Sequence, residues 1–101
     1  MVNQKIRSYF GFAVRSGAIV YGADTILRST KRPHLVAISE DINETAAKRL
    51  TKYCENKSIK LLVFLKGEIA DLVHRENCKC AGILDKNLAS AIITQRNELP
   101  N

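Results

Sequence analysis

Hydrophobic residues recur at intervals of three and four along much of the chain, which is the pattern of helices with one buried face. The spacing predicts helices over residues 3–15, 22–30, 42–56 and 67–74, and a fifth near the end of the chain. The side chains that this pattern turns toward a core are Ile6, Phe10, Ala13 or Val14, Ile26, Leu27, Ala47, Leu50, Cys54, Ile69, Leu72, Val73, Leu88, Ala91 and Ile92.

Local signals mark the ends of several of these helices. Gly17 follows the first, where a left-handed glycine commonly ends a helix. Asp41 and Glu44 have the spacing of a capping box, with aspartate in the usual place of serine or threonine. Asp85 is expected to cap the fifth helix, and residues 97–101 are expected to fray.

Three runs are apolar almost throughout, as strands covered on both faces are. They occupy residues 34–39, 59–65 and 80–84, and a short extended segment is expected over residues 18–21. Strands that alternate with helices through short connections indicate an α/β layered domain with a largely parallel sheet.

Length and composition place the chain among ordinary globular proteins. Its 101 residues are enough for a single domain over residues 1–101, and 46% of them are hydrophobic and 26% charged. No apolar run reaches the roughly 20 residues that a membrane helix requires, and the N-terminus is a poor signal peptide, so we expect a cytoplasmic location.

The three cysteines cannot all pair within one chain, which favours a reducing compartment. Cys78 and Cys80 are separated by one residue, whereas common zinc and redox motifs have two. We therefore expect no metal site and no cofactor, and we expect buried thiols that act as small hydrophobic groups.

The net charge of +6 is distributed unevenly. Residues 1–39 carry a net charge of +5, and the remaining 62 residues contribute only +1. This asymmetry suggests a polyanionic partner, for which RNA, DNA and an acidic membrane are all candidates. Charge alone does not choose among them.

The stretch from Ser16 to Pro33 combines a glycine at a predicted helix start with several cations. A helix that begins at Gly22 would point free backbone N–H groups at an anion such as phosphate. Arg28, Lys31 and Arg32 follow closely and could hold a polyanion there. The alternative on spacing alone is a helix with a solvated basic face.

The sequence contains no motif that indicates catalysis. A Walker phosphate loop, a G-x-S-x-G elbow and a dinucleotide glycine fingerprint are all absent. Paired carboxylates are not evident, and His74 is far more typical of a surface or half-buried histidine than of a general base. We therefore expect no enzymatic activity.

Several of these features occur together in one known family. They are the spacing of Gly17 and Gly22, the basic helix, the apolar strand that ends at Ser39, and the later stretch CAGILDK. In these respects the chain, over roughly residues 3–95, resembles the L-seven-Ae/L-thirty-e family of ribosomal proteins, which bind kink-turn RNA. It is most similar to the small bacterial members of the YlxQ type. The resemblance implies a three-layer α-β-α sandwich around a four-stranded mixed sheet, with residues 18–21 as the fourth, edge strand.

The resemblance also implies two RNA-binding loops. The family's first loop carries Gly-x-Asn-Glu-x-x-Lys, and it matches the residues from Gly22 to Arg28, where the glycine and the positive charge are kept. Asp24 and Thr25 replace the Asn and Glu that read guanines of sheared G·A pairs, so a donor is lost and one acceptor is weakened. The second loop packs against flipped-out bases in the family, and its counterpart at residues 77–80 is more polar.

The sequence therefore predicts a non-enzymatic, ribosome-associated protein that binds structured RNA as a monomer. The residues expected to contact RNA are Gly22, Asp24, Thr25, Arg28, Lys31, Arg32, Cys78, Lys79 and Cys80. Two alternatives stay open: a protein-interaction module of the same fold that has lost kink-turn binding, and an RNA-recognition partner of a separate RNA-modifying enzyme.

Overall fold

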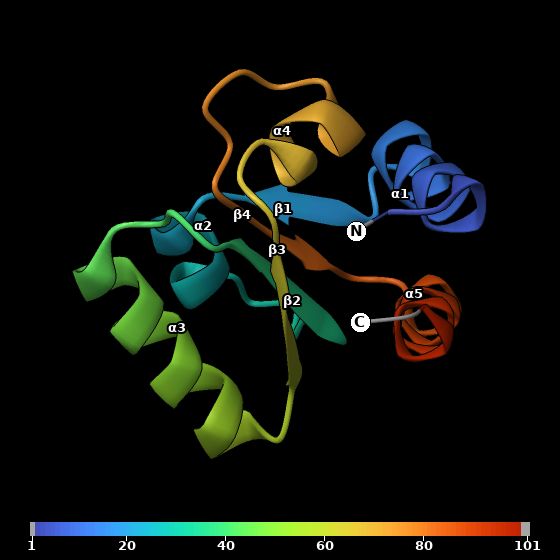
Figure 1. Cartoon of the computed structure of the whole chain (residues 1–101). Coiled ribbons are helices and arrows are strands. Elements are labelled where there is room, and N and C mark those ends of the chain that lie inside the picture. Colours follow the sequence, from blue (N-terminus) through green and yellow to red (C-terminus); the bar gives the residue numbers. More distant parts are fainter. Residues whose placement is uncertain (1, 100–101) are drawn as a thin grey trace.

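The computed structural model describes residues 2–99, in which helices cover both faces of a four-stranded sheet (Figure 1). The elements in chain order are α1 (Gln4–Ser16), β1 (Ile19–Tyr21), α2 (Ala23–Arg28), β2 (Leu35–Ser39), α3 (Glu44–Lys57), β3 (Lys60–Phe64), α4 (Glu68–Val73), β4 (Cys80–Ile83) and α5 (Lys86–Glu98). The three-layer α-β-α sandwich that the resemblance implied is confirmed. No helix within residues 2–99 is long and apolar enough to cross a membrane.

The sheet has the strand order β1-β4-β2-β3 and is mixed. β2 and β3 are parallel, with Leu35 opposite Lys60, whereas β4 is antiparallel to both β1 and β2. The mixed sheet and the edge position of β1 are confirmed, and the expectation of a largely parallel sheet is wrong. α4 is a short helix in the connection between β3 and β4. The chain re-enters the sheet at the end at which it left, so β4 runs antiparallel to β2.

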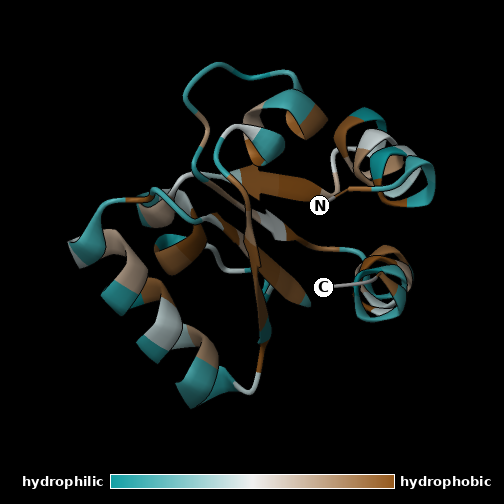
Figure 2. Ribbon diagram, viewed as in Figure 1, coloured by the Kyte–Doolittle hydropathy of each residue, from teal (hydrophilic) through white to brown (hydrophobic). Residues whose placement is uncertain are grey.

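Two hydrophobic clusters hold the layers together. α1, α4 and α5 pack on one face, where Phe10 and Phe64 meet edge to face with ring centroids 5.8 Å apart. α2 and α3 pack on the other face, where Ile26 and Leu50 are fully buried against β2. In Figure 2 the strands are mostly hydrophobic, and the helices are hydrophilic on the sides turned away from the sheet.

Most of the predicted helix ends are confirmed. Gly17 ends α1 in the left-handed region, with φ 72°. Asp85 caps α5 by accepting from the backbone N–H of Leu88 at 2.9 Å. Asn3 caps α1, and its side chain also donates to the Gln95 side chain at 3.0 Å, which joins the start of α1 to α5. α1 and α5 accordingly lie beside one another in Figure 1.

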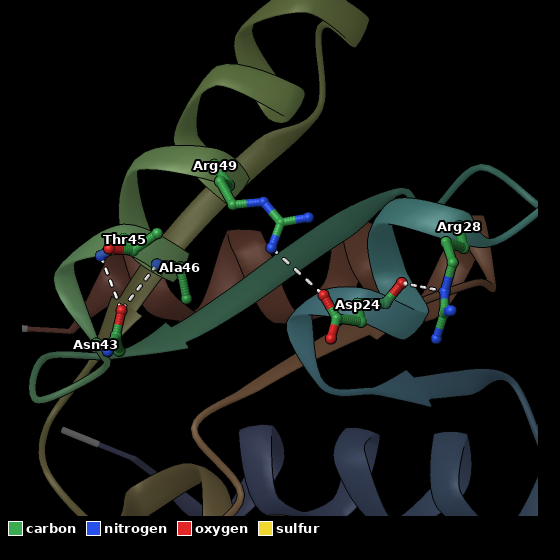
Figure 3. A network of polar contacts seen from close by, with 6 residues as sticks. All are labelled: Asp24, Arg28, Asn43, Thr45, Ala46 and Arg49. Carbon is green, nitrogen blue, oxygen red and sulfur yellow. Dashed lines mark hydrogen bonds and ion pairs between the residues drawn. The ribbon is translucent and has the colours of Figure 1, made fainter.

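The predicted capping box at Asp41 and Glu44 is wrong, because α3 begins at Glu44 and not directly after Asp41. Its cap is Asn43, whose side chain accepts from the backbone N–H groups of Thr45 at 2.8 Å and Ala46 at 3.2 Å (Figure 3). An Asp and an Asn two residues apart are equally good caps by residue type. Asp41 is instead engaged by side chains from outside the helix, as described below.

β3 is fully covered on one face and only partly on the other, which corrects the expectation of a strand buried on both faces. Leu62 and Phe64 are buried, whereas Val63 is 45% exposed and Leu65, just beyond the strand, is 53% exposed. β3 is the edge strand next to β2, and on the α3 side of the sheet Leu61 packs against the hydrophobic cluster while Val63 stays exposed. A continuous apolar run therefore did not indicate continuous burial.

Several predicted inward positions and boundaries also shift. In α5 the buried residues are Ala89 and Ile92, while Leu88 and Ala91 are half-buried, as is Ala47 in α3. α2 ends at residue 28 rather than residue 30. The tail expected to fray over residues 97–101 is helical at 97 and 98, and residues 100–101 lie outside the described residues.

Candidate nucleic-acid interface

A cavity of about 350 Å³ opens where β1 ends and β4 begins. Three segments far apart in the sequence surround it: the turn into α2, the start of α3, and the loop between α4 and β4. Its lining residues are Tyr21, Gly22, Ala23, Ile42, Ala46, Arg75, Glu76, Asn77, Cys78, Lys79 and Cys80. The structure thus brings together four of the nine predicted contact residues, from both predicted loops.

Gly22 fixes the first side of this cavity. Its backbone has φ 87°, a region that residues with a side chain rarely adopt, although open space lies where a Cβ would be. Its N–H donates to the Cys80 carbonyl at 3.2 Å, so the turn into α2 is bonded to the start of β4. Glycine is needed here for its backbone conformation.

The loop between α4 and β4 forms the opposite side and is held at two points. At one, the Arg75 guanidinium lies over the Tyr21 ring, 4.1 Å from its centroid. At the other, Lys79 Nζ contacts Asp41 Oδ2 at 2.6 Å, and the Ser39 hydroxyl donates to the same carboxylate. Lys79 and Ser39 lower the pKa of Asp41 from 3.8 to about 2.

Asp24 lies beside the cavity and is paired across two helices (Figure 3). Arg49 Nη1 of α3 lies 3.3 Å from Asp24 Oδ1, and Arg28 Nε donates to the Asp24 backbone carbonyl at 3.3 Å. The Asp24 carboxylate would repel phosphate, and the Arg49 guanidinium offsets that charge. This pair was not predicted from the sequence, because the packing of α2 against α3 cannot be read from local spacing.

The other predicted residues lie away from the cavity. Thr25, Arg28 and Lys31 line a second hollow of about 450 Å³, together with residues from β1. Arg32 lies at the far end of α3, where its guanidinium donates to the carbonyls of Lys57 and Ser58. The three cations expected to act together are therefore divided between two places.

The helix terminus at Gly22 is weaker than the sequence suggested. α2 has only six residues, so few peptide dipoles align along it. Attraction of phosphate near Gly22 must therefore come mainly from cationic side chains, of which Lys79 and Arg49 are already paired with carboxylates.

The cysteines near the cavity are poor nucleophiles. Burial raises the pKa of Cys80 and of Cys54 to about 11, and burial also raises the pKa of half-buried Cys78. Among residues 2–99, no three His, Cys, Asp or Glu side chains gather in a way that could hold a metal ion.

With this geometry in place, comparisons with known proteins identify the family. The chain matches the sequence model of the Ribosomal protein L7Ae/L30e/S12e/Gadd45 family over residues 4–94, and it belongs to that family. A search of the curated proteins gave no significant match.

Two solved structures are similar to this fold. A protein of unknown function from Bacillus halodurans has a TM-score of 0.87 and 18% identity, with 95% of this chain and 100% of that chain covered. The 15.5kD RNA binding protein of Giardia lamblia has a TM-score of 0.73 and 18% identity, with 94% of this chain and 90% of that chain covered. At this level of identity the similarity concerns the fold.

Proposed function

We propose that the protein is a non-enzymatic RNA-binding protein that acts in the cytoplasm on structured RNA, either ribosomal RNA or another RNA with a kink-turn. The cavity between the Gly22 turn and the loop over residues 75–80 carries this proposal, because it joins the two segments that match the family's RNA-binding loops. Membership of the family over residues 4–94 and the fold shared with the 15.5kD RNA binding protein of Giardia lamblia support it.

In this mechanism the cavity accepts part of an irregular RNA and the surrounding cations hold its backbone. Ile42 and Ala46 supply an apolar wall, and the stacked Arg75 and Tyr21 supply a cation beside an aromatic ring. Unstacked bases pack on such surfaces, whereas a regular duplex keeps its bases inside. Structured RNA with exposed bases should therefore bind more tightly than a plain duplex.

Filling the cavity tests this function directly. Ala46 lines the cavity from α3, so the variant Ala46→Tyr should place a ring in it and lower affinity for a kink-turn RNA by at least tenfold. Thr51→Tyr is the matched control, because Thr51 is exposed on the same helix and does not line the cavity. Affinities for a kink-turn RNA and for a duplex of equal length would be measured by fluorescence anisotropy.

Two results would contradict the proposal. Equal affinity of the unmodified protein for the kink-turn and the duplex would show that the protein does not recognise irregular RNA. Failure to bind either RNA, together with purification free of RNase-sensitive nucleic acid, would favour a protein-interaction module of this fold.

A further inference from the structure

The two edges of the sheet differ in what covers their outward backbone groups. At the β3 edge, the Arg96 guanidinium donates to the Val63 carbonyl. Just beyond the same strand, Glu68 Oε1 accepts from the backbone N–H of Leu65. β1 forms the opposite edge, and none of the hydrogen bonds within residues 2–99 joins a side chain to its backbone. The β1 edge is therefore open, whereas side chains occupy the β3 edge.

The hydrogen-bond pattern of the sheet fixes which groups of β1 point outward. Ala18, just before the strand, and Gly22, just after it, both form backbone bonds on the β4 side. Bonded and non-bonded residues alternate along an antiparallel ladder, so Val20 also bonds to β4. The backbone N–H and C=O groups of Ile19 and Tyr21 therefore point away from β4, and no partner for them lies within residues 2–99.

The hollow of about 450 Å³ lies at this open edge and has an apolar part. Ile19 and Val20 line it from β1, and Leu84 lines it from the end of β4. The hollow also has a basic part, formed by the exposed side chains of Arg28 and Lys31. No acidic side chain of residues 2–99 lines it.

Cations stand on both faces of the sheet beside the β1 edge. Arg28 and Lys31 are on the face of α2, against which Val20 packs. On the other face, the Arg75 guanidinium lies over the Tyr21 ring, 4.1 Å from its centroid. None of these three cations is in an ion pair within residues 2–99. Their charge is therefore available to an acidic partner.

We propose that the β1 edge binds an extended acidic segment of another protein, which joins the sheet as a fifth strand. The outward groups of Ile19 and Tyr21 supply the backbone hydrogen bonds, and the hollow takes an apolar side chain of the segment. The flanking cations bind its carboxylates. This inference goes beyond the proposed function, because it names a protein partner at a surface outside the cavity.

A protein strand fits this edge better than RNA or a second copy of the chain. A strand presents N–H and C=O groups in alternation, which match the open groups of β1, whereas an RNA backbone offers no such row. A second copy carries the same net charge of +6 and would be repelled. Arg28 and Lys31 are also expected to attract RNA, so RNA and the segment would compete for these two cations.

The experiment uses three blocked peptides of about seven residues, a usual strand length. The first alternates glutamate with valine, and the second alternates lysine with valine. The third is the first peptide with N-methyl groups on alternate residues, so it keeps the charge and cannot complete the ladder. Each is titrated into the isotope-labelled full chain up to millimolar concentration, and NMR follows the shift and the hydrogen exchange of every backbone amide.

We expect the glutamate peptide to shift the amides of Ile19 and Tyr21 most and to slow their exchange. The Val20 amide, already bonded to β4, is the internal control and should exchange slowly throughout. The N-methylated peptide should bind roughly tenfold more weakly, because backbone hydrogen bonds are lost. The lysine peptide should not bind, since the flanking cations repel it.

Two charge reversals separate this edge from general attraction. Lys31→Glu should lower affinity for the glutamate peptide by roughly fivefold and allow the lysine peptide to bind. Lys60→Glu is the matched control, because it changes the charge equally at an exposed position of β3, the opposite edge. It should leave both affinities unchanged.

Several results would overturn the proposal. One is a glutamate peptide that leaves the Ile19 and Tyr21 amides unshifted at millimolar concentration, or that shifts β3 instead. Equal binding of the N-methylated peptide would show attraction by charge without an added strand. Protection of the same two amides by a kink-turn RNA, and not by the peptide, would assign this edge to RNA.

Discussion

Asp41 joins the end of β2 to the loop that borders the cavity. Its pKa is lowered to about 2 by Lys79 and Ser39, so this carboxylate stays charged far below neutral pH. Because the folded pKa lies below the ordinary value of 3.8, the contact stabilises the fold above about pH 4. That stabilisation is lost as the pH falls through about 2.

An NMR titration of the Asp41 side chain should therefore have its midpoint near pH 2. Lys79→Met removes the largest cause of the shift, so the midpoint should move up toward 3.8. Asp71 is a suitable internal control, because it is an exposed carboxylate in an ion pair with Arg7 elsewhere on the surface. A midpoint at Asp41 that does not respond to Lys79→Met would contradict the assignment of the shift to Lys79.

The thiols offer a second test at this scale. With pKa values raised by burial, Cys54, Cys78 and Cys80 should hold almost no thiolate at pH 7.5. Alkylation by iodoacetamide should be much slower than for free cysteine, and half-buried Cys78 should react first. Mass spectrometry after timed quenching measures this, with protein unfolded in guanidinium chloride as the control. Rapid modification of Cys80 in the folded protein would contradict its burial.

The unpaired edge of β3 is a part of the sheet to which a strand of another chain could bind. Two side chains occupy its outward backbone groups: Arg96 donates to the Val63 carbonyl, and the backbone N–H of Leu65 donates to Glu68 Oε1 at 2.7 Å. The Arg96 guanidinium also lies 4.6 Å from the centroid of the Phe64 ring. Charged side chains at an edge commonly prevent strand pairing between molecules.

Replacing Arg96 by alanine should expose this edge next to the apolar side chains of Val63 and Leu65. We expect concentration-dependent self-association in sedimentation experiments and a loss of about 1–2 kcal/mol in the free energy of unfolding. Arg75→Ala is the matched control, since Arg75 also stacks on an aromatic ring but lies at the other end of the sheet order, on Tyr21 of β1, away from β3. If both variants stay equally monomeric, Arg96 does not protect the edge.

The elements themselves were largely predictable, and their arrangement was less so. Spacings of three and four located all five helices, because one buried face is enough to fix that pattern. The antiparallel direction of β4 was missed, because the local pattern of an apolar strand does not fix the direction in which it runs. The apolar run of β3 was misleading, since Val63 is as hydrophobic as a core residue and yet half-exposed.

The candidate site could be predicted only in part, because some of its contacts join residues that are distant in sequence. Gly22 and the loop over residues 77–80 were identified through the family resemblance, and the structure places them around one cavity. Arg49 and Arg75 act through partners that are distant in sequence, Asp24 and Tyr21, so no local motif marked them. The choice of Asp41 over Asn43 as a cap failed because both residue types suit that role.

At the scale of the whole molecule, the positive charge is spread over separate surfaces. Arg28 and Lys31 lie beside the second hollow, whereas Arg32 is bonded to carbonyls at the end of α3. Replacing Arg28 and Lys31 together by alanine should reduce the slope of log affinity for RNA against log salt by up to about two. Arg32→Ala should leave that slope unchanged. Equal effects of the three positions would mean that RNA extends to the end of α3.

The hydrogen bond between Asn3 and Gln95 has a consequence for the connectivity of the fold. It holds α1 against α5, on the face of the sheet opposite α2 and α3, so one side-chain contact joins residues that are 92 positions apart in the sequence. A glycine and serine linker between the N- and C-termini would add a covalent connection between the same two helices. Closure would remove conformations from the unfolded chain and raise the melting temperature, while the loops around the cavity would keep their lengths.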